Sequence, residues 1–144
     1  MEDRSHERRI RRSMSPRTAT RFYLDNVTER HGLSAMVFAN EKGEFILGSE
    51  VRLFGNARLI GAVNEEYGRK LAKIAPFAAA DREDGADNAW KGRDDEPIFA
   101  KRLKISNGEY FIAFVGNPQQ AEEAYQDAVE GVIRIQARST KQAA

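Results

Sequence analysis

The 144-residue sequence contains no cysteine, which excludes disulfides, thiolate metal sites and cysteine nucleophiles together. It has only two histidines, His6 and His31, so the commonest general base and metal ligand is scarce. No apolar run approaches the roughly 20 residues of a membrane span, and the first 17 residues lack the apolar core of a secretory signal. We therefore expect no cofactor, no metal and no membrane span, and a cytoplasmic location.

An excess of charge of one sign is also missing. The chain has 23 basic and 22 acidic residues, a formal net charge of +1. Duplex nucleic-acid binders usually carry a clear basic excess, so nucleic acid is not the expected partner. Hydrophobic residues make up 41% and charged residues 31%, which is ordinary for one globular domain of this length.

The residue patterns of known catalytic sites are absent as well. Neither GxxxxGK[ST] nor GxGxxG occurs, which argues against nucleotide hydrolysis. The acidic stretch from Asp81 fails the EF-hand pattern, because its fifth and sixth positions are Gly85 and Ala86. His31 ends a predicted helix, where the helix dipole suits it, and no motif supplies a catalytic partner. The sequence predicts a protein that is not an enzyme.

Periodicity and turn signals predict an α+β fold with a mostly antiparallel sheet of four or five strands and helices on both faces. Asn107-Gly108 is a strong hairpin signal, and Asn117 followed by Pro118 is a good helix start. The predicted order is a helix over 18–31, strands over 33–39 and 44–48, a linker over 49–55, a helix over 56–75, a loop over 77–96, strands over 98–105 and 110–115, and a helix from Pro118.

The predicted second helix carries one apolar stripe, formed by Leu59, Ile60, Val63, Tyr67, Leu71 and Ile74. Pro76 marks its expected end. Gly61 and Gly68 are seven residues apart and would lie on nearly one face. Two interpretations stay open for them: close approach of another helix, or simple tolerance of glycine.

Segment 1–17 is expected to be a disordered, arginine-rich arm, and 137–144 a flexible tail. The arm is interpreted as an inert solvated tail, as a docking element for an acidic protein surface or anionic membrane, or as a contact for nucleic acid. Trp90, alone in the acidic 77–96 loop, is either an interface residue or folded back onto the domain.

The element order resembles the roadblock (dynein light chain) family, whose fold is profilin-like. The matching residues are Leu24-Asp-Asn-Val27, His31-Gly32-Leu33, and the hairpin pattern from Ala35 to Ser49 with Gly43 in its turn. The resemblance covers about 18–136. It implies a non-enzymatic platform that dimerises through its second helix and the neighbouring edge strand and docks small Ras-like GTPases. The family has three strands after its second helix, so the third lies within 77–96 or is missing.

The resemblance places a partner or dimer interface on the free face of the 56–75 helix and on the basic edge strand. Its candidate residues are Arg58, Gly61, Asn64, Glu65, Gly68, Arg69 and Lys101. The predicted function is a non-enzymatic homodimeric adaptor or regulator that binds a protein partner such as a small Ras-like GTPase. The alternative is a small-molecule sensor domain of GAF or profilin-like type, with a pocket under the 77–96 loop.

Overall fold

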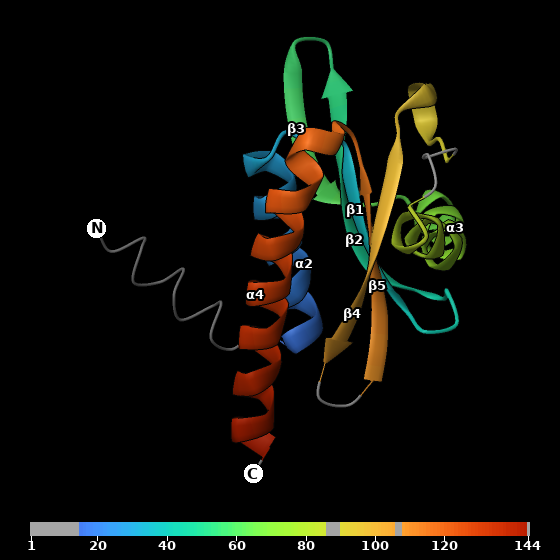
Figure 1. Cartoon of the computed structure of the whole chain (residues 1–144). Coiled ribbons are helices and arrows are strands. Elements are labelled where there is room, and N and C mark those ends of the chain that lie inside the picture. Colours follow the sequence, from blue (N-terminus) through green and yellow to red (C-terminus); the bar gives the residue numbers. More distant parts are fainter. Residues whose placement is uncertain (1–14, 86–89, 106–107, 144) are drawn as a thin grey trace, which may run out of the picture.

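A computed structural model describes residues 15–85, 90–105 and 108–143, with side chains described as far as residue 135 (Figure 1). The elements in chain order are α2 (Pro16–Arg30), β1 (Ala35–Asn40), β2 (Phe45–Phe54), β3 (Ala57–Ala62), α3 (Glu65–Glu83), the 3-10 helix η1 (Arg93–Asp95), β4 (Ile98–Ile105), β5 (Gly108–Val115) and α4 (Pro118–Ala143).

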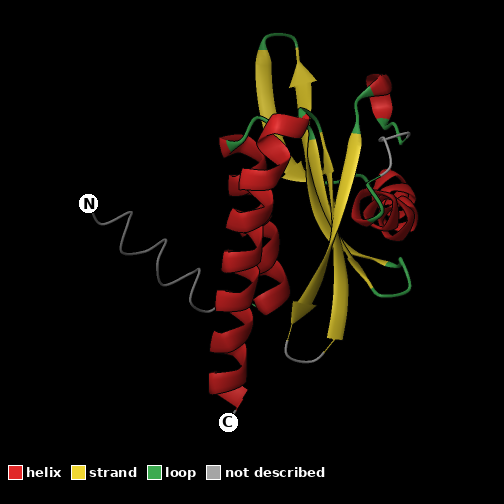
Figure 2. Cartoon of the chain, in the orientation of Figure 1, coloured by secondary structure: helices red, strands yellow, loops and turns green. Residues whose placement is uncertain are grey.

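The five strands form one antiparallel sheet in the order β3-β2-β1-β5-β4. α3 covers one face of this sheet, whereas α2 and α4 pack side by side on the other face and run along the strands (Figures 1 and 2). The predicted α+β class, with an antiparallel sheet and helices on both faces, is confirmed.

Two apolar cores flank the sheet because the central strands β1 and β5 are apolar on both faces. Val37 and Ala113 point into the core beneath α3, and Met36 and Ile112 into the core beneath α2 and α4. The α3 core is rich in alanine, which lets the helix lie close to the strands. β1 and β5 lie inside the sheet, and β4 is an edge strand, a position that suits its basic residues.

The predicted helix over 56–75 is wrong in its first half, as is the linker over 49–55. β2 continues to Phe54 and turns back at Gly55-Asn56 into β3, with Gly55 at a φ of +60°. A glycine with positive φ in the first central position suits a tight hairpin turn. α3 starts later, where the Asn64 side chain accepts a hydrogen bond from the Tyr67 N–H at 3.2 Å. Among the described residues only β4 and β5 follow α3, so the expected third strand after the helix is missing there, and the fifth strand of the sheet is β3, before the helix.

α3 also runs past Pro76, the expected end, to Glu83, so the predicted 77–96 loop is partly helical. Pro76 faces the β1–β2 turn, where a Cβ built on Gly43 would lie 3.3 Å from its ring. After the helix, a short bridge between Lys91 and Pro97 and the helix η1 order the chain further. Packing against the sheet keeps α3 helical across its proline.

The ends of the chain differ from the sequence prediction in two places. α2 begins at Pro16 with Ser15 as its cap, so the last residues of the predicted arm, 16 and 17, belong to the helix. α4 continues to Ala143 and includes most of the predicted tail 137–144. The predicted start of α4 is confirmed, since the Asn117 side chain accepts from the Gln119 N–H at 2.9 Å. Residues 1–14 of the predicted arm, and Asn107 of the predicted turn, lie outside the described residues.

Contact between α2 and α4 depends on Gly131. A Cβ built there would lie 2.0 Å from the ring of Tyr23, and the Tyr23 hydroxyl donates to the Asp127 carbonyl at 2.8 Å. Gly68, in contrast, is approached by the Phe45 ring of its own sheet, at 2.7 Å from a built Cβ. The predicted close approach of another helix at Gly61 and Gly68 is wrong in its geometry, because Gly61 lies in β3 and the two glycines do not share a helix.

We expect Gly131→Ala to lower the free energy of unfolding by about 1–3 kcal/mol, since overpacking against the ring outweighs the gain in helix propensity. Chemical denaturation monitored by circular dichroism measures the loss. Gly108→Ala is the control, because a Cβ there makes only ordinary contacts, with Tyr110 at 3.7 Å. Equal stability of the two variants would contradict the close packing of α2 and α4.

Candidate functional site

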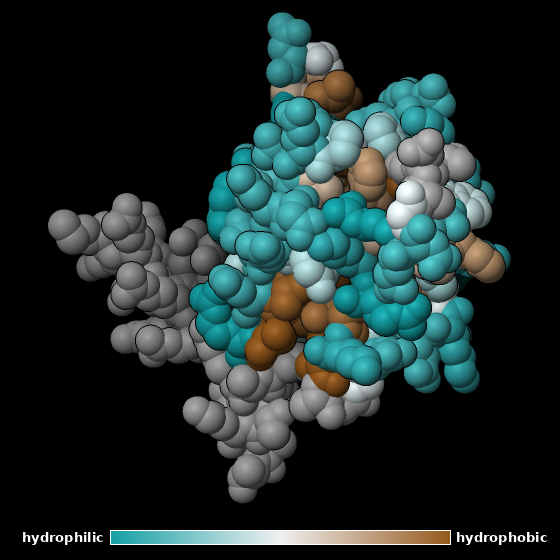
Figure 3. Space-filling model, in the orientation of Figure 1, coloured by the Kyte–Doolittle hydropathy of each residue, from teal (hydrophilic) through white to brown (hydrophobic). Residues whose placement is uncertain are grey.

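The β2–β3 hairpin extends past the rest of the sheet and exposes large apolar side chains (Figures 1 and 3). Leu53 is 74% exposed, Phe54 63% and Leu59 53%. An exposed apolar group on a projecting element is typical of a protein-binding surface. These side chains are exposed because β2 extends beyond the residues that contact β1 and the helices. No helix therefore covers either face of the hairpin tip.

β3 is an edge strand, with β2 as its single neighbour in the sheet. The Val63 N–H donates to the Gly48 carbonyl at 2.9 Å. Because hydrogen-bonded positions alternate along a strand, this bond shows which residues of β3 turn their backbone groups toward β2. The backbone N–H and C=O groups of residues 57, 59 and 61 therefore point toward β2, while those of Arg58, Ile60 and Ala62 point away from the sheet. The outer side of β3 can therefore accept a further strand.

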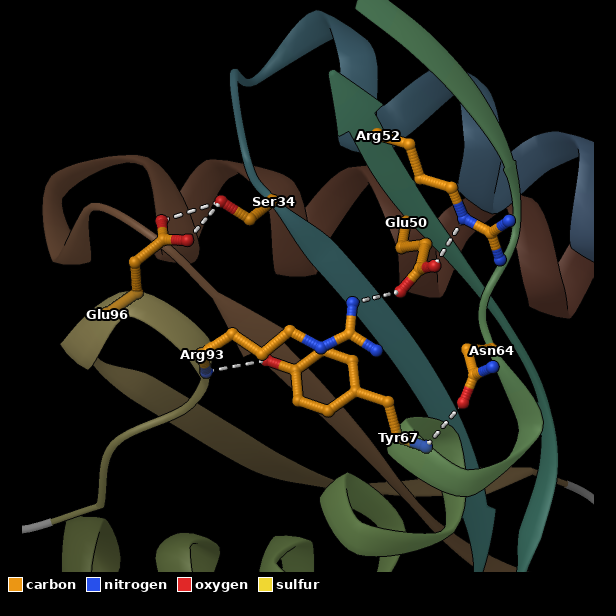
Figure 4. A network of polar contacts seen from close by, with 7 residues as sticks. All are labelled: Ser34, Glu50, Arg52, Asn64, Tyr67, Arg93 and Glu96. Carbon is orange, nitrogen blue, oxygen red and sulfur yellow. Dashed lines mark hydrogen bonds and ion pairs between the residues drawn. The ribbon is translucent and has the colours of Figure 1, made fainter. Parts of the chain in front are cut away.

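A polar cluster joins the base of this hairpin to the loop before β4 (Figure 4). The Glu50 side chain is only 3% exposed, and both of its oxygens are paired. Arg52 Nε donates to one oxygen at 2.7 Å, and Arg93 Nη1 to the other at 3.2 Å. A buried carboxylate is costly unless it is paired, so these two contacts hold both arginines in place.

Tyr67 of α3 fastens the same loop. The Arg93 guanidinium carbon lies 3.8 Å from the centre of the Tyr67 ring, and the Arg93 N–H donates to the Tyr67 hydroxyl at 3.1 Å. Burial raises the pKa of the Tyr67 hydroxyl above its ordinary value. Nearby, Ser34 Oγ lies 2.6 and 2.8 Å from the two carboxylate oxygens of Glu96. The loop is thus tied to β1, β2 and α3 at once.

The turn between these contacts has an uncommon backbone. Asp94 and Asp95 have φ values of +55° and +58°, in the left-handed region that glycine favours. Both side chains are exposed beside the half-exposed Arg93. Aspartate tolerates this region better than most residues, and the anchors on either side of the turn hold it there.

α3 presents its outer side to solvent on the face of the sheet that it covers (Figure 1). Phe77 is 63% exposed on this side, and its ring centre lies 6.2 Å from that of Trp90. The Trp90 indole N–H donates to Asp81 Oδ2 at 2.8 Å, and the ring packs against the α3 core. Of the two interpretations of Trp90, folding back onto the domain is the one that the structure shows.

His31 joins the two helices on the opposite face. Its Nε2 lies 2.6 Å from Asp127 Oδ2 of α4, and Arg30 Nη1 lies 3.1 Å from the same oxygen. The hydrogen bond from His31, followed by the nearby positive charges, lowers the pKa of Asp127. This arrangement supports the structural role expected for His31 at a helix end. Asp127 could not be paired with it from sequence, because the two are 96 residues apart.

The structure divides the predicted interface residues between three places. Arg58 and Gly61 lie on β3, where Arg58 Nη2 donates to the Leu33 carbonyl at 3.4 Å. Asn64 caps α3, and Glu65 and Arg69 form an exposed ion pair of 2.5 Å on its first turns. Gly61, Asn64, Glu65 and Arg69 lie around the junction of β3 and α3, whereas Arg58 lies at the other end of β3, beside the hairpin turn.

Gly68 and Lys101 are placed differently. Gly68 is buried beneath Phe45. Lys101 is on β4, at the opposite edge of the sheet, and donates to Glu122 of α4 at 2.6 Å. That hydrogen bond lowers the pKa of Glu122. Sequence reasoning missed Leu53, Phe54 and Glu50, although the Gly55-Asn56 dipeptide could have revealed the hairpin that carries them.

The described residues contain no group of three or more histidine, aspartate or glutamate side chains able to hold a metal ion. None of the described helices combines the length and apolarity needed to cross a membrane. A cavity of about 470 Å³ lies at the edge of β2, between the first turns of α2 and α3. These parts of the chain also carry exposed apolar side chains at the hairpin tip, an edge strand and ion pairs.

Comparison of the fold with solved structures finds a likeness to Myxococcus xanthus MglB, a protein of the roadblock type. The TM-score is 0.51 and the sequence identity 9%, and the match covers 85% of this chain and 90% of that one. No protein-family model and no curated protein matches the sequence. At this identity the likeness concerns the fold, and the chain has a roadblock-type fold, as its element order indicated.

The buried Glu50 yields a prediction on stability. We expect Glu50→Gln to lower the free energy of unfolding by about 1–3 kcal/mol, because the amide leaves two guanidinium groups without their carboxylate. Urea denaturation measures the loss. Glu65→Gln is the control: it removes an exposed ion pair and should change stability by no more than about 0.5 kcal/mol. If Glu50→Gln were as stable as this control, the cluster would not anchor the loop.

Proposed function

We propose that this protein is a non-enzymatic homodimeric regulator that binds a small Ras-like GTPase. The observation that carries the proposal is a roadblock-type fold whose β3 edge is open beside an α3 with a solvent-facing side. Roadblock domains are similar to such regulators, because two copies form a dimer and the dimer binds a GTPase. The absence of cysteine suits a reducing compartment, so we place this activity in the cytoplasm.

The register of β3 supports pairing with a second copy. A twofold axis beside Ile60 would let the outward backbone groups of Arg58, Ile60 and Ala62 bond to the same residues of the other copy in antiparallel order. Leu59 of one copy would then lie opposite Gly61 of the other. Leu59 is exposed and Gly61 has open space where a Cβ would stand, so the pair is complementary in shape.

Such a dimer would carry two α3 helices on one face of a continuous ten-stranded sheet, five strands from each copy. The outer sides of these helices would form a shared surface, with Phe77 as an exposed aromatic anchor. Glu65 and Arg69 would lie on the same helices near the twofold axis. An aromatic residue surrounded by charged side chains is the usual composition of an interface hot spot. We propose this surface as the GTPase contact.

Ile60→Pro tests the dimer. Proline removes an outward N–H while residues 59 and 61 keep their bonds to β2, so the monomer fold should survive. We expect the wild-type chain to be a dimer at micromolar concentration and Ile60→Pro a monomer, as measured by light scattering after size-exclusion chromatography. The control Ile60→Thr keeps the N–H and should remain dimeric. A wild-type chain that stays monomeric would overturn the pairing.

The GTPase contact is tested with purified small Ras-like GTPases of the source organism, each loaded with GDP or a non-hydrolysable GTP analogue. We expect one of them to bind with a preference for one nucleotide state, as measured by calorimetry. Phe77→Ser should weaken this binding about thirtyfold, since a central aromatic anchor contributes about 2 kcal/mol.

Phe22→Ser is the matched control, because Phe22 is an exposed phenylalanine on α2, across the sheet from α3. It should leave GTPase affinity unchanged. Equal weakening by both changes would place the contact elsewhere, and no binding by any GTPase in either nucleotide state would refute the partner class.

A further inference from the structure

The two ends of the chain carry an excess of positive charge that the rest of the molecule lacks. Residues 1–17 contain six arginines against three acids, and residues 131–144 contain Arg134, Arg138 and Lys141 against none. The two segments together have a net charge of +6, so residues 18–130 have a net charge of −5 in a chain of +1. Such an asymmetry indicates an anionic partner for the ends of the chain.

Both ends leave the domain at the same place. α2 and α4 are antiparallel, because Arg30 contacts Asp127 whereas Tyr23, two turns earlier on α2, packs on Gly131, one turn later on α4. From Tyr23 back to Pro16, and from Gly131 onward, the two helices continue side by side for about 10 Å. Figure 1 shows the start of α2 beside the lower half of α4. The N-terminal segment therefore joins the domain beside the basic last turns of α4.

The same end of the molecule exposes apolar side chains. Ile133 of α4 is 46% exposed, and Val129, one turn earlier, is only partly buried against the core beneath α2 and α4. Ile105, the last residue of β4, is also only partly buried against that core. Figure 3 shows this apolar surface where the lower half of α4 meets the end of the sheet. The last turns of α4 lie beyond the strands (Figure 1), so no sheet covers them.

Basic residues flank this apolar surface. Arg134, which follows Ile133, is exposed, and the side chain of Lys104, which precedes Ile105, is 79% exposed. Positions 134, 138 and 141 are separated by four and three residues, so they share one side of α4. The apolar and the basic groups are therefore neighbours on the same end of the molecule.

Two acidic residues lie close to this surface and offset part of its charge. Glu109 lies 3.6 Å from Arg102 and 3.7 Å from Lys104, so it serves two basic side chains with one carboxylate. Glu130 lies on α4 directly before the basic segment. Positive charge still predominates, because α4 has no acid after Glu130.

We propose that this end of the molecule binds the surface of an anionic membrane. Ile133 enters the head-group region of the bilayer, while the basic residues of both chain ends contact the lipid phosphates and carboxylates. This inference goes beyond the proposed GTPase regulation. It uses neither the β3 edge nor α3, and it depends neither on the dimer nor on the GTPase.

A membrane suits this arrangement better than nucleic acid or an acidic protein. The basic residues belong to three separate parts of the chain, and a bilayer presents its charge as a continuous plane that meets them without a fixed spacing. An exposed isoleucine among them is stabilised by entering the head-group region, whereas the phosphates of a duplex offer it nothing. Neither chain end contains an aromatic residue on which a base could stack.

The test is flotation of the full chain with vesicles, at low and at physiological salt. One set of vesicles is phosphatidylcholine alone, and the other contains about one third phosphatidylserine. We expect binding to the anionic vesicles to be at least about tenfold stronger than to the neutral ones, and to weaken with salt.

Four variants locate the contact. Arg134→Gln should weaken binding to anionic vesicles about fivefold, the usual contribution of one basic residue near such a surface. Ile133→Ser should also weaken it about fivefold, through the loss of apolar insertion. The matched controls are Lys73→Gln, an exposed lysine of α3 on the other face of the sheet, and Leu53→Ser at the exposed hairpin tip. Both controls should bind like the wild type.

Equal binding to the two kinds of vesicle would overturn the proposal, as would undiminished binding of Arg134→Gln or equal losses in Ile133→Ser and Leu53→Ser. Duplex DNA or polyglutamate, added at equal negative charge, should leave most of the chain on the anionic vesicles. Displacement by either would also overturn the proposal, because the site would then bind nucleic acid or an acidic protein. Ile60→Pro should keep the preference for anionic vesicles, so failure of the dimer and failure of this surface are separable.

Discussion

The constraint on which the structure depends is the burial of β1 and β5 on both faces. Each strand alternates apolar side chains above and below, and the two pair along their whole length from Ala35–Val115 to Asn40–Tyr110. A strand that is apolar on both faces needs a layer on each side, which here means α3 on one and α2 with α4 on the other. The strands outside this pair become the edges, so the open β3 edge is a consequence of where the core lies.

The exposed hairpin tip and the cavity lie where the two helical layers stop. The β2–β3 hairpin outruns the helices and exposes its apolar tip, and a cavity lies beside Phe45, Leu47 and Gly48 at the start of β2. Between these two places, the buried Glu50 and its arginines tie the hairpin base to the loop before β4 (Figure 4). The buried middle of β2 thus joins the stable centre of the sheet to the exposed tip of the hairpin.

Local signals were sufficient for much of the fold. The apolar run 110–115 and the Asn117-Pro118 start were recognisable because their residues suit one structure and little else. The segment 56–75 was misread because Leu59, Ile60 and Val63 satisfy helical spacing while also fitting a strand. The Gly55-Asn56 turn and the Asn64 cap resolve this ambiguity. They do so only when these two local signals are given more weight than the apolar stripe, which continues from β3 into α3.

The candidate site was harder to predict than the fold. Gly61, Asn64, Glu65 and Arg69 lie near one junction because they are close in sequence, but Arg58 lies at the far end of β3 beside the hairpin turn. Lys101 lies at the other edge of the sheet, and the contacts of Glu50 with Arg93 and of His31 with Asp127 join residues far apart in the chain. Composition and periodicity determined an antiparallel α+β domain without a recognisable catalytic motif, since those properties follow from local patterns of polarity. Strand order, and with it the free edge and the cavity, was decided by tertiary packing, because which strand neighbours which depends on how the helices cover both faces of the central pair.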